Sequence, residues 1–264
     1  MYRLYCHAGG SDDCHEVWWD SQIRTVAKRS FLEQYKGQLT PAQAAEGIRV
    51  AAQNAKNLLA DAELLLENGR WARACALAIL AIEEAGKTAI LRGMLLARNG
   101  EELKHERRAY RSHVKKNLTW IFPQLVSEGA RKLDSFRRVF DEDSDHGLLL
   151  ESVKQMAFYS DACGDCHWSL PTGVIDQELA ETMVSVARIV VSPEPSAMST
   201  EAELELWVRH MRPVWKQSVE EMKLALLTCY VEAKEKGILS GERSPEDMAK
   251  FLGFDYARTP PNNL

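Results

Sequence analysis

The stretch that decides the fold is WARACALAILAIEEAGKTAILRGMLLA, residues Trp71–Ala97. Apolar residues lie on nearly every side of it through the run Ala74–Ile82, which predicts a helix that is buried almost all round. A helix of this kind needs neighbours on most of its faces, so it belongs at the centre of a helical bundle. The run has nine residues and is far too short to cross a bilayer, so no membrane contact is expected.

Further helices are predicted on both sides of this central one. Thr40-Pro41 is a typical helix start, because threonine caps the first turn and proline fits its first position. Apolar residues then recur at three- and four-residue steps from Ile48 to Leu66. After the central helix, a third and basic helix is expected from about Glu101 to Trp120.

The second half of the chain predicts shorter helices, and it lacks the alternation that strands show. Thr200 and Glu203 form a capping box, which opens a long helix that Pro213 should kink or break. We therefore predict an all-α protein in three parts. They are an N-terminal extension (1–40), a helical bundle (41–192) and a C-terminal helical extension (193–264).

Composition narrows the function classes. The formal net charge is −5, so contact with nucleic acid requires a local basic patch rather than average charge. The N-terminus lacks the apolar core of a signal peptide, and the six cysteines follow no secretory pattern. These features predict a cytoplasmic protein with reduced thiols and no cofactor.

The basic patch is KHERRAYRSHVKK, Lys104–Lys116, which holds six Lys/Arg and two His. Arginine and lysine bind phosphate, and histidine moves protons near neutral pH. Arg108 and His113 lie about 140° apart round a straight helix. A joint role for them therefore needs a helix end, a bend or a partner protomer. The alternative is a solvated basic helix face without a specific role.

The second polar motif, Glu83-Glu84-Ala85-Gly86-Lys87, interrupts the most apolar helix. Charges on a buried helix need partners. Glu83 and Lys87 can pair at i,i+4, and Glu84 then needs an arginine or histidine from the next helix. Alternatively, this is the stripe where the helix reaches solvent, with Gly86 as a close-packing contact.

These motifs together resemble a known family. The sequence LAILAIEEAGKTAIL, then YRSHVKK, then KQMAFYSDACGDCHWSLP is similar to the AbiV family of abortive-infection proteins, which belongs to the HEPN superfamily. The resemblance covers roughly residues 42–192. It implies a HEPN-type helical bundle, a homodimer and a role in prokaryotic anti-phage defence.

Active HEPN proteins are metal-independent endoribonucleases whose signature is an arginine, four to six residues and a histidine. The resemblance therefore implies catalysis by Arg108, Arg111 and His113 and products with 2′,3′-cyclic phosphate ends. It implies RNA binding or support of the site by a further set: Glu84, Lys87, Arg107, Lys115 and Lys116. A phage-encoded activator or inhibitor protein is a further expected partner. The alternative is a non-catalytic module that binds RNA, or a phage or host protein, to block translation.

A third motif is Cys163-Gly-Asp-Cys166-His167. Its cysteines and histidine could hold zinc together with a residue of the N-terminus (Cys6, His7, Cys14 or His15). The spacing also fits haem c attachment, which the missing export signal argues against. The third alternative is local variation in a loop without a metal.

Overall fold

The computed structural model describes residues 35–140, 145–163, 166–191, 198–239 and 243–255. Residues 38–264 form one compact unit, and residues 1–37 belong to a separate one. Most of the predicted N-terminal extension therefore lies outside the described residues. The division of the larger unit at residue 193 stays a prediction.

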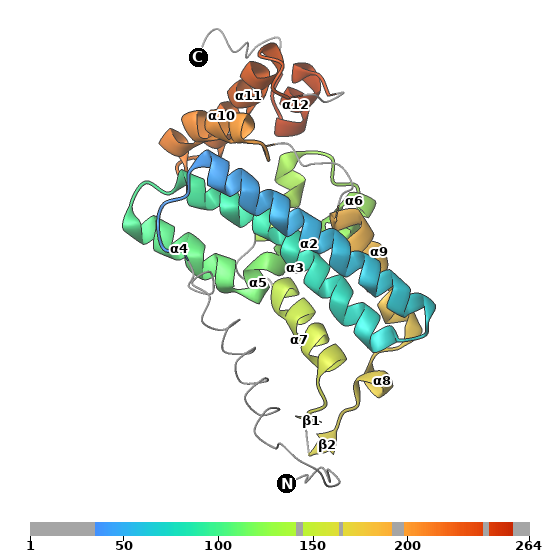
Figure 1. Cartoon of the computed structure of the whole chain (residues 1–264). Coiled ribbons are helices and arrows are strands. Elements are labelled where there is room, and N and C mark those ends of the chain that lie inside the picture. The colour runs from blue at the N-terminus through green and yellow to red at the C-terminus, as the bar shows by residue number, and fades with distance from the viewer. Residues whose placement is uncertain (1–34, 141–144, 164–165, 192–197, 240–242, 256–264) are drawn as a thin grey trace, which may run out of the picture. The chain divides into compact units, whose positions relative to one another are not determined.

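The all-α prediction is confirmed, and a long hairpin of two helices dominates the large unit (Figure 1). Helix α2 spans Pro41–Glu67 and helix α3 spans Trp71–Leu96. Thr40 caps α2 in a full capping box with Gln43, as the Thr-Pro start predicts. Because the turn between the two helices contains Gly69 at φ +68°, the chain reverses there without the strain of a Cβ atom.

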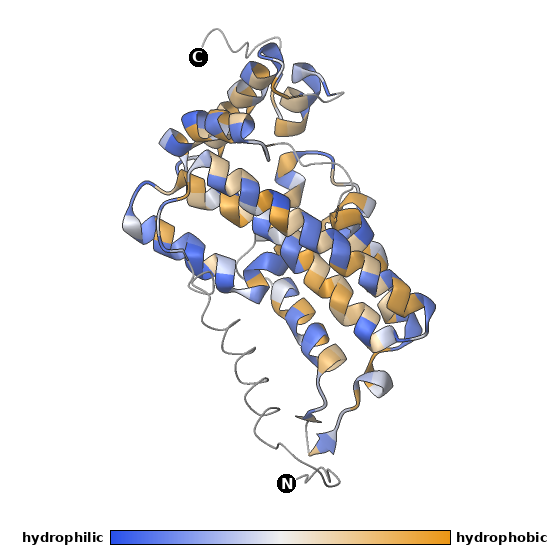
Figure 2. Ribbon diagram, in the orientation of Figure 1, coloured by the Kyte–Doolittle hydropathy of each residue, from blue (hydrophilic) through white to orange (hydrophobic). Residues whose placement is uncertain are grey.

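Helix α3 is buried along most of its length, as its composition predicts, and Figure 2 shows it as largely hydrophobic. Its first half packs with α7 and α9 in one apolar cluster that includes Ile79, Ile82 and Val184. Its second half packs with α2, α4, α10 and α11 in another cluster that includes Leu95 and Leu204. The motif Glu83–Lys87 lies between these two clusters.

The prediction of one basic helix from Glu101 to Trp120 is wrong. Helix α4 spans Gly100–Arg111 and ends at Ser112. A separate one-turn helix, α5, then spans His113–Lys116. A 3₁₀ helix, η2, follows at Asn117–Ile121. Ser112 has extended φ/ψ, and its hydroxyl accepts a hydrogen bond from the backbone N–H of Lys115. A serine that caps a new helix in this way competes with continuation of the old one. Figure 2 shows α4 as predominantly hydrophilic.

The remaining elements are short. In chain order they are α6 (Phe122–Ser127), η3 (Leu133–Phe140), α7 (His146–Phe158), β1 (Ala162–Cys163), β2 (His167–Trp168), α8 (Pro171–Val174), α9 (Gln177–Val190), α10 (Glu201–Met211), η4 (Arg212–Val214), α11 (Val219–Glu235) and α12 (Pro245–Leu252).

Two features of these elements bear on the sequence analysis. The capping box of Thr200 and Glu203 is present, and the predicted long helix breaks into α10 and α11 at Pro213. The segment that carries the Cys-x-x-Cys-His motif contains a minimal antiparallel hairpin, β1–β2, in which Ala162 pairs with Trp168.

The segment around α10 packs directly on α3. The side chain of Arg212 donates two hydrogen bonds to the backbone carbonyl of Leu95, at 3.2 and 2.5 Å, near the C-terminus of α3. Arg92 of α3 donates to the carbonyl of Met198 at 2.8 Å. Within the described part of the chain, no helix is long and apolar enough to span a membrane.

Candidate functional site

The site begins with a buried carboxylate in the middle of α3. Glu83 is 2 % exposed, and it directly follows Ile82, a residue of the first apolar cluster. Burying an ionised carboxylate is costly unless cations or hydrogen-bond donors compensate it. The chemistry of the site therefore depends on which side chains reach Glu83.

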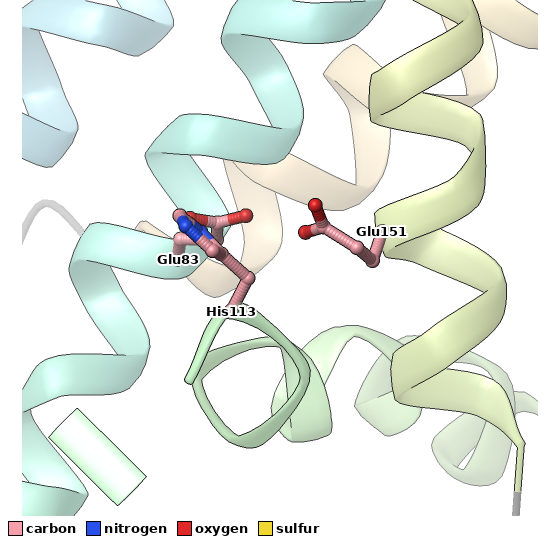
Figure 3. A group of neighbouring side chains, drawn as sticks. All are labelled: Glu83, His113 and Glu151. Carbon is pink, nitrogen blue, oxygen red and sulfur yellow. The ribbon is translucent and has the colours of Figure 1, made fainter. Parts of the chain in front are cut away.

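Three basic side chains reach it. Nδ1 of His113 lies 2.6 Å from Oε2 of Glu83, and Nζ of Lys154 lies 2.6 Å from Oε1. Nζ of Lys116 is farther away, 3.7 Å from Oε2. Glu151 joins from α7, since its Oε2 lies 2.6 Å from Nζ of Lys154. Figure 3 shows the side chains of Glu83, His113 and Glu151 converging on one another.

Two glycines bring α5 close enough for these contacts. A Cβ atom on Gly86 would lie 2.0 Å from the carbonyl oxygen of Lys116. A Cβ atom on Gly147 would lie 2.7 Å from the carbonyl oxygen of Val114. The backbone of α5 thus lies between α3 and α7 at a distance that only glycine permits. His113 is the first residue of α5, so this packing places it beside Glu83.

The hydrogen-bond network assigns the tautomer of His113. A nitrogen 2.6 Å from a buried carboxylate oxygen carries the proton and donates it. Nζ of Lys154 lies only 3.1 Å from the same nitrogen, but two of its three protons go to Glu83 and Glu151, and a protonated Nδ1 cannot accept the third. The Nε2 atom of His113 is then left with a free lone pair. Because the His113 side chain is 51 % exposed, a substrate can reach that atom.

Charge in the centre is balanced between two carboxylates and two lysines. Burial lowers the pKa of Lys116, and the nearby Glu83 opposes this shift only in part. Partial burial raises the pKa of Glu151, but hydrogen bonds from Lys154 and Gln155 outweigh it, so the net shift is downward. Both directions fit a compact ionic centre that is largely removed from water.

Two pairings predicted for the EEAGK motif are wrong. Lys87 pairs with Glu84 at 2.5 Å, not with Glu83. Glu84 therefore takes its partner from its own helix and not from the basic one. Lys87 also lies over the ring of Tyr110, 5.5 Å from its centroid, which links α3 to α4. The reason is burial: Glu83 points to the interior, where α5 and α7 supply cations, and Glu84 lies at the half-buried edge.

The other predicted residues lie on the last turn of α4 and on α5. Arg108 and Arg111 are exposed on that last turn, and in the described part of the chain their side chains make no hydrogen bond or ion pair. Arg107 and Lys115 are half-buried and have other interactions. The break at Ser112 separates Arg108 from His113, so the 140° expected for a straight helix does not apply.

The Cys-x-x-Cys-His motif lies in the β1–β2 hairpin. Cys166 and His167 are exposed, and Cys166 has a φ of +68°. The side chain of Cys163 and the N-terminal cysteines and histidines lie outside the described residues. Among the residues that the structure describes, the group spaced to hold a metal ion is instead Glu83, His113 and Glu151.

Sequence reasoning did not select Glu83 as the central carboxylate, nor Glu151 and Lys154 of α7. A signal for α7 was present: Glu151 and Lys154 are i,i+3, and Lys154 opens the third family-like stretch. Which of the two adjacent glutamates is buried could not be read from the sequence, because apolar residues surround both.

Comparison with known proteins identifies the family. The family model described as AbiV, a HEPN family, matches residues 43–192. No curated protein matches the chain, and neither does any solved structure. The matched range contains the whole centre, from Glu83 on α3 to Lys154 on α7. More than half of the chain is covered, and the protein belongs to the AbiV family of HEPN proteins.

Proposed function

We propose that this abortive-infection HEPN protein is a metal-independent endoribonuclease whose base is His113. The observation that carries the proposal is the pairing of an exposed imidazole with a buried carboxylate. Glu83 holds Nδ1 at 2.6 Å, and half of the His113 side chain is exposed, so Nε2 is the nitrogen that remains for a substrate. This is the arrangement by which a carboxylate orients a catalytic histidine in other hydrolytic sites.

The proposed reaction is an intramolecular transesterification of RNA. Nε2 of His113 removes the proton of a ribose 2′-OH, and the resulting alkoxide attacks the adjacent phosphorus. The bond to the 5′ oxygen breaks, and that oxygen takes up a proton. The products are a 2′,3′-cyclic phosphate and a 5′-OH. DNA lacks the 2′-OH and cannot follow this route.

Arg108 and Arg111 supply the positive charge in this proposal. Both are exposed on the last turn of α4 and carry no partner among the described residues. A guanidinium without an internal carboxylate is free to hold phosphate oxygens, where charge accumulates in the transition state. Lys115 and Arg107, both half-buried, belong to the same basic segment and are proposed to support binding of the rest of the RNA.

The test compares purified wild type with His113→Ala on total RNA, followed by analysis of the 3′ ends. We expect the rate to fall by about 10²–10⁴-fold, the usual contribution of a general base. His105→Ala is the matched control, because His105 is exposed in the same basic segment but lies on α4, away from Glu83. It should keep wild-type cleavage.

An RNA with a single 2′-deoxy nucleotide at the cleaved position should resist at that position. If wild type and His113→Ala give the same pattern without cyclic-phosphate ends, the nuclease proposal fails. RNA binding that weakens with salt and survives His113→Ala would then favour a non-catalytic module.

The proposal includes a homodimer, in which two copies of the basic segment form one cleft, because HEPN sites pair by symmetry. Measuring the molar mass of the protein in solution tests this directly. A monomer at the concentration used for the cleavage assay would contradict the homodimer. Anti-phage defence, and its control by a phage-encoded activator or inhibitor, stay predictions from the family.

A further inference from the structure

The centre around Glu83 has the donor set of a metal site. Nδ1 of His113 and one carboxylate oxygen each of Glu83 and Glu151 all lie within 4.8 Å of one another. They come from three separate helices, α5, α3 and α7 (Figure 3). One imidazole and two carboxylates are a common ligand set for zinc and other divalent transition metals.

A lysine already occupies the middle of this set. Nζ of Lys154 lies 2.6 Å from Glu83, 2.6 Å from Glu151 and 3.1 Å from Nδ1 of His113. Its side chain is 5 % exposed, so the ammonium is as buried as the carboxylate that it meets. A metal ion that used the same three ligands would have to stand within about 2 Å of each, which is the space that the ammonium fills.

We propose that the Lys154 ammonium is the resident cation of this centre and takes the place of a metal ion there. It holds the carboxylates of Glu83 and Glu151 together and, through Glu83, positions the ring of His113. Lys154 is thus a positioning residue, because it acts on the reaction through another side chain.

The charges support this assignment. Two carboxylates, Glu83 and Glu151, face two lysines, Lys154 and Lys116, and among the described residues the one further group paired with Glu83 is His113. The formal charges of these four groups cancel. With Nδ1 donating to Glu83, Nε2 is the ring nitrogen that is left to act as a base.

Loss of the ammonium should convert the centre into a metal site. Without Lys154, the buried carboxylate of Glu83, the partly buried carboxylate of Glu151 and an imidazole remain around an open position, with one negative charge in excess. A divalent ion would replace the lost contacts and more than offset that excess negative charge. The role of Lys154 in RNA cleavage rests on the proposed function, but metal binding by a variant without Lys154 does not. Failure of the metal-site proposal can therefore be distinguished from failure of the nuclease proposal.

The experiment measures zinc bound per chain for wild type and Lys154→Ala, by equilibrium dialysis of the full-length protein against Zn²⁺. We expect the variant to bind about one zinc per chain more than wild type, because the Cys-x-x-Cys-His motif is the same in both proteins. Cobalt(II) should give visible absorption bands of a low-coordinate site in the variant alone. Zinc should also raise its thermal midpoint, since a metal that binds only the folded state stabilises it.

The matched control is Lys223→Ala. Lys223 is equally buried, at 5 % side-chain exposure, and pairs with two carboxylates, Asp134 at 2.9 Å and Glu220 at 3.2 Å. Among the residues that the structure describes, no histidine is paired with this lysine, so its removal leaves no three-ligand set there and no additional zinc should bind. The double variant Lys154→Ala/Glu151→Gln should likewise lose most of the zinc.

Three results would overturn the proposal: no additional zinc in Lys154→Ala, zinc in wild type that is lost on Glu151→Gln, or equal additional zinc in Lys223→Ala. If Lys154→Ala does not fold, the same measurement is made on Lys154→Gln. The glutamine amide keeps a hydrogen bond to a carboxylate but carries no charge. Zinc binding by that variant supports the proposal, and its absence refutes it.

Discussion

The approach of α5 to α3 makes Gly86→Ala the most informative single substitution. The added Cβ atom would lie 2.0 Å from the carbonyl oxygen of Lys116. A carbon and a carbonyl oxygen rarely come nearer than about 3.3 Å, so α5 must move away by about 1 Å or more. The obstacle is backbone, and no side-chain rotation can relieve it.

A movement of that size removes the key hydrogen bond. Nδ1 of His113 lies 2.6 Å from Glu83, and a further 1 Å takes the pair to about 3.6 Å, beyond hydrogen-bond range. Overpacking costs about 1–3 kcal/mol of unfolding free energy, and alanine returns up to about 1 kcal/mol through better helix propensity. A small net loss of stability should therefore accompany a large loss of function.

The assay pairs urea unfolding with RNA cleavage, and Gly100→Ala serves as control. Gly100 opens α4, and its added Cβ atom would meet nothing within 4 Å. That variant should be as stable as wild type or slightly more stable, with normal activity. If Gly86→Ala keeps both wild-type stability and wild-type cleavage, then α5 is not held against α3 as described, and the reasoning about the site is wrong.

Two further predictions concern charge. Glu83→Gln should lower the free energy of unfolding by about 3–5 kcal/mol, because it leaves buried cations unpaired. Glu84→Gln should lower it by about 1 kcal/mol or less. Chemical denaturation of both variants measures the two free energies. Hydrogen bonds from Lys236 and His210 lower the pKa of Glu232 to about 2, from an ordinary 4.5. The stability that Glu232 contributes is thus present above about pH 4.5 and is lost as the pH falls toward 2. Glu232→Gln should flatten the pH dependence of unfolding in that window, and an unchanged slope would contradict the pairing.

Much of the fold could be predicted because its determinants are local. A threonine followed by proline starts α2, and a capping box starts α10, since these side chains satisfy backbone groups within three residues. The burial of α3 follows from its own composition. Such signals need no knowledge of what packs against the helix.

The centre could be predicted only in part, because its decisive contacts join distant segments. Lys154 meets Glu83 across 71 residues, and His113 meets it across 30. Periodicity placed both glutamates of the EEAGK motif on one helix but could not tell which one faced inward. The break at Ser112 also depends on α5 fitting between Gly86 and Gly147, which no local pattern reveals.

The position of the ionic centre argues that function, and not stability, explains it. Glu83 lies in the most apolar helix of the protein, where an apolar residue would pack without any need for partners. Replacing a buried ion pair by apolar side chains is often neutral or stabilising, so the fold does not require these charges. What an apolar residue could not do is orient the exposed imidazole of His113 with its Nε2 atom free. The centre depends on two glycines, on the helix break at Ser112 and on two lysines. Together these features position the ring of His113.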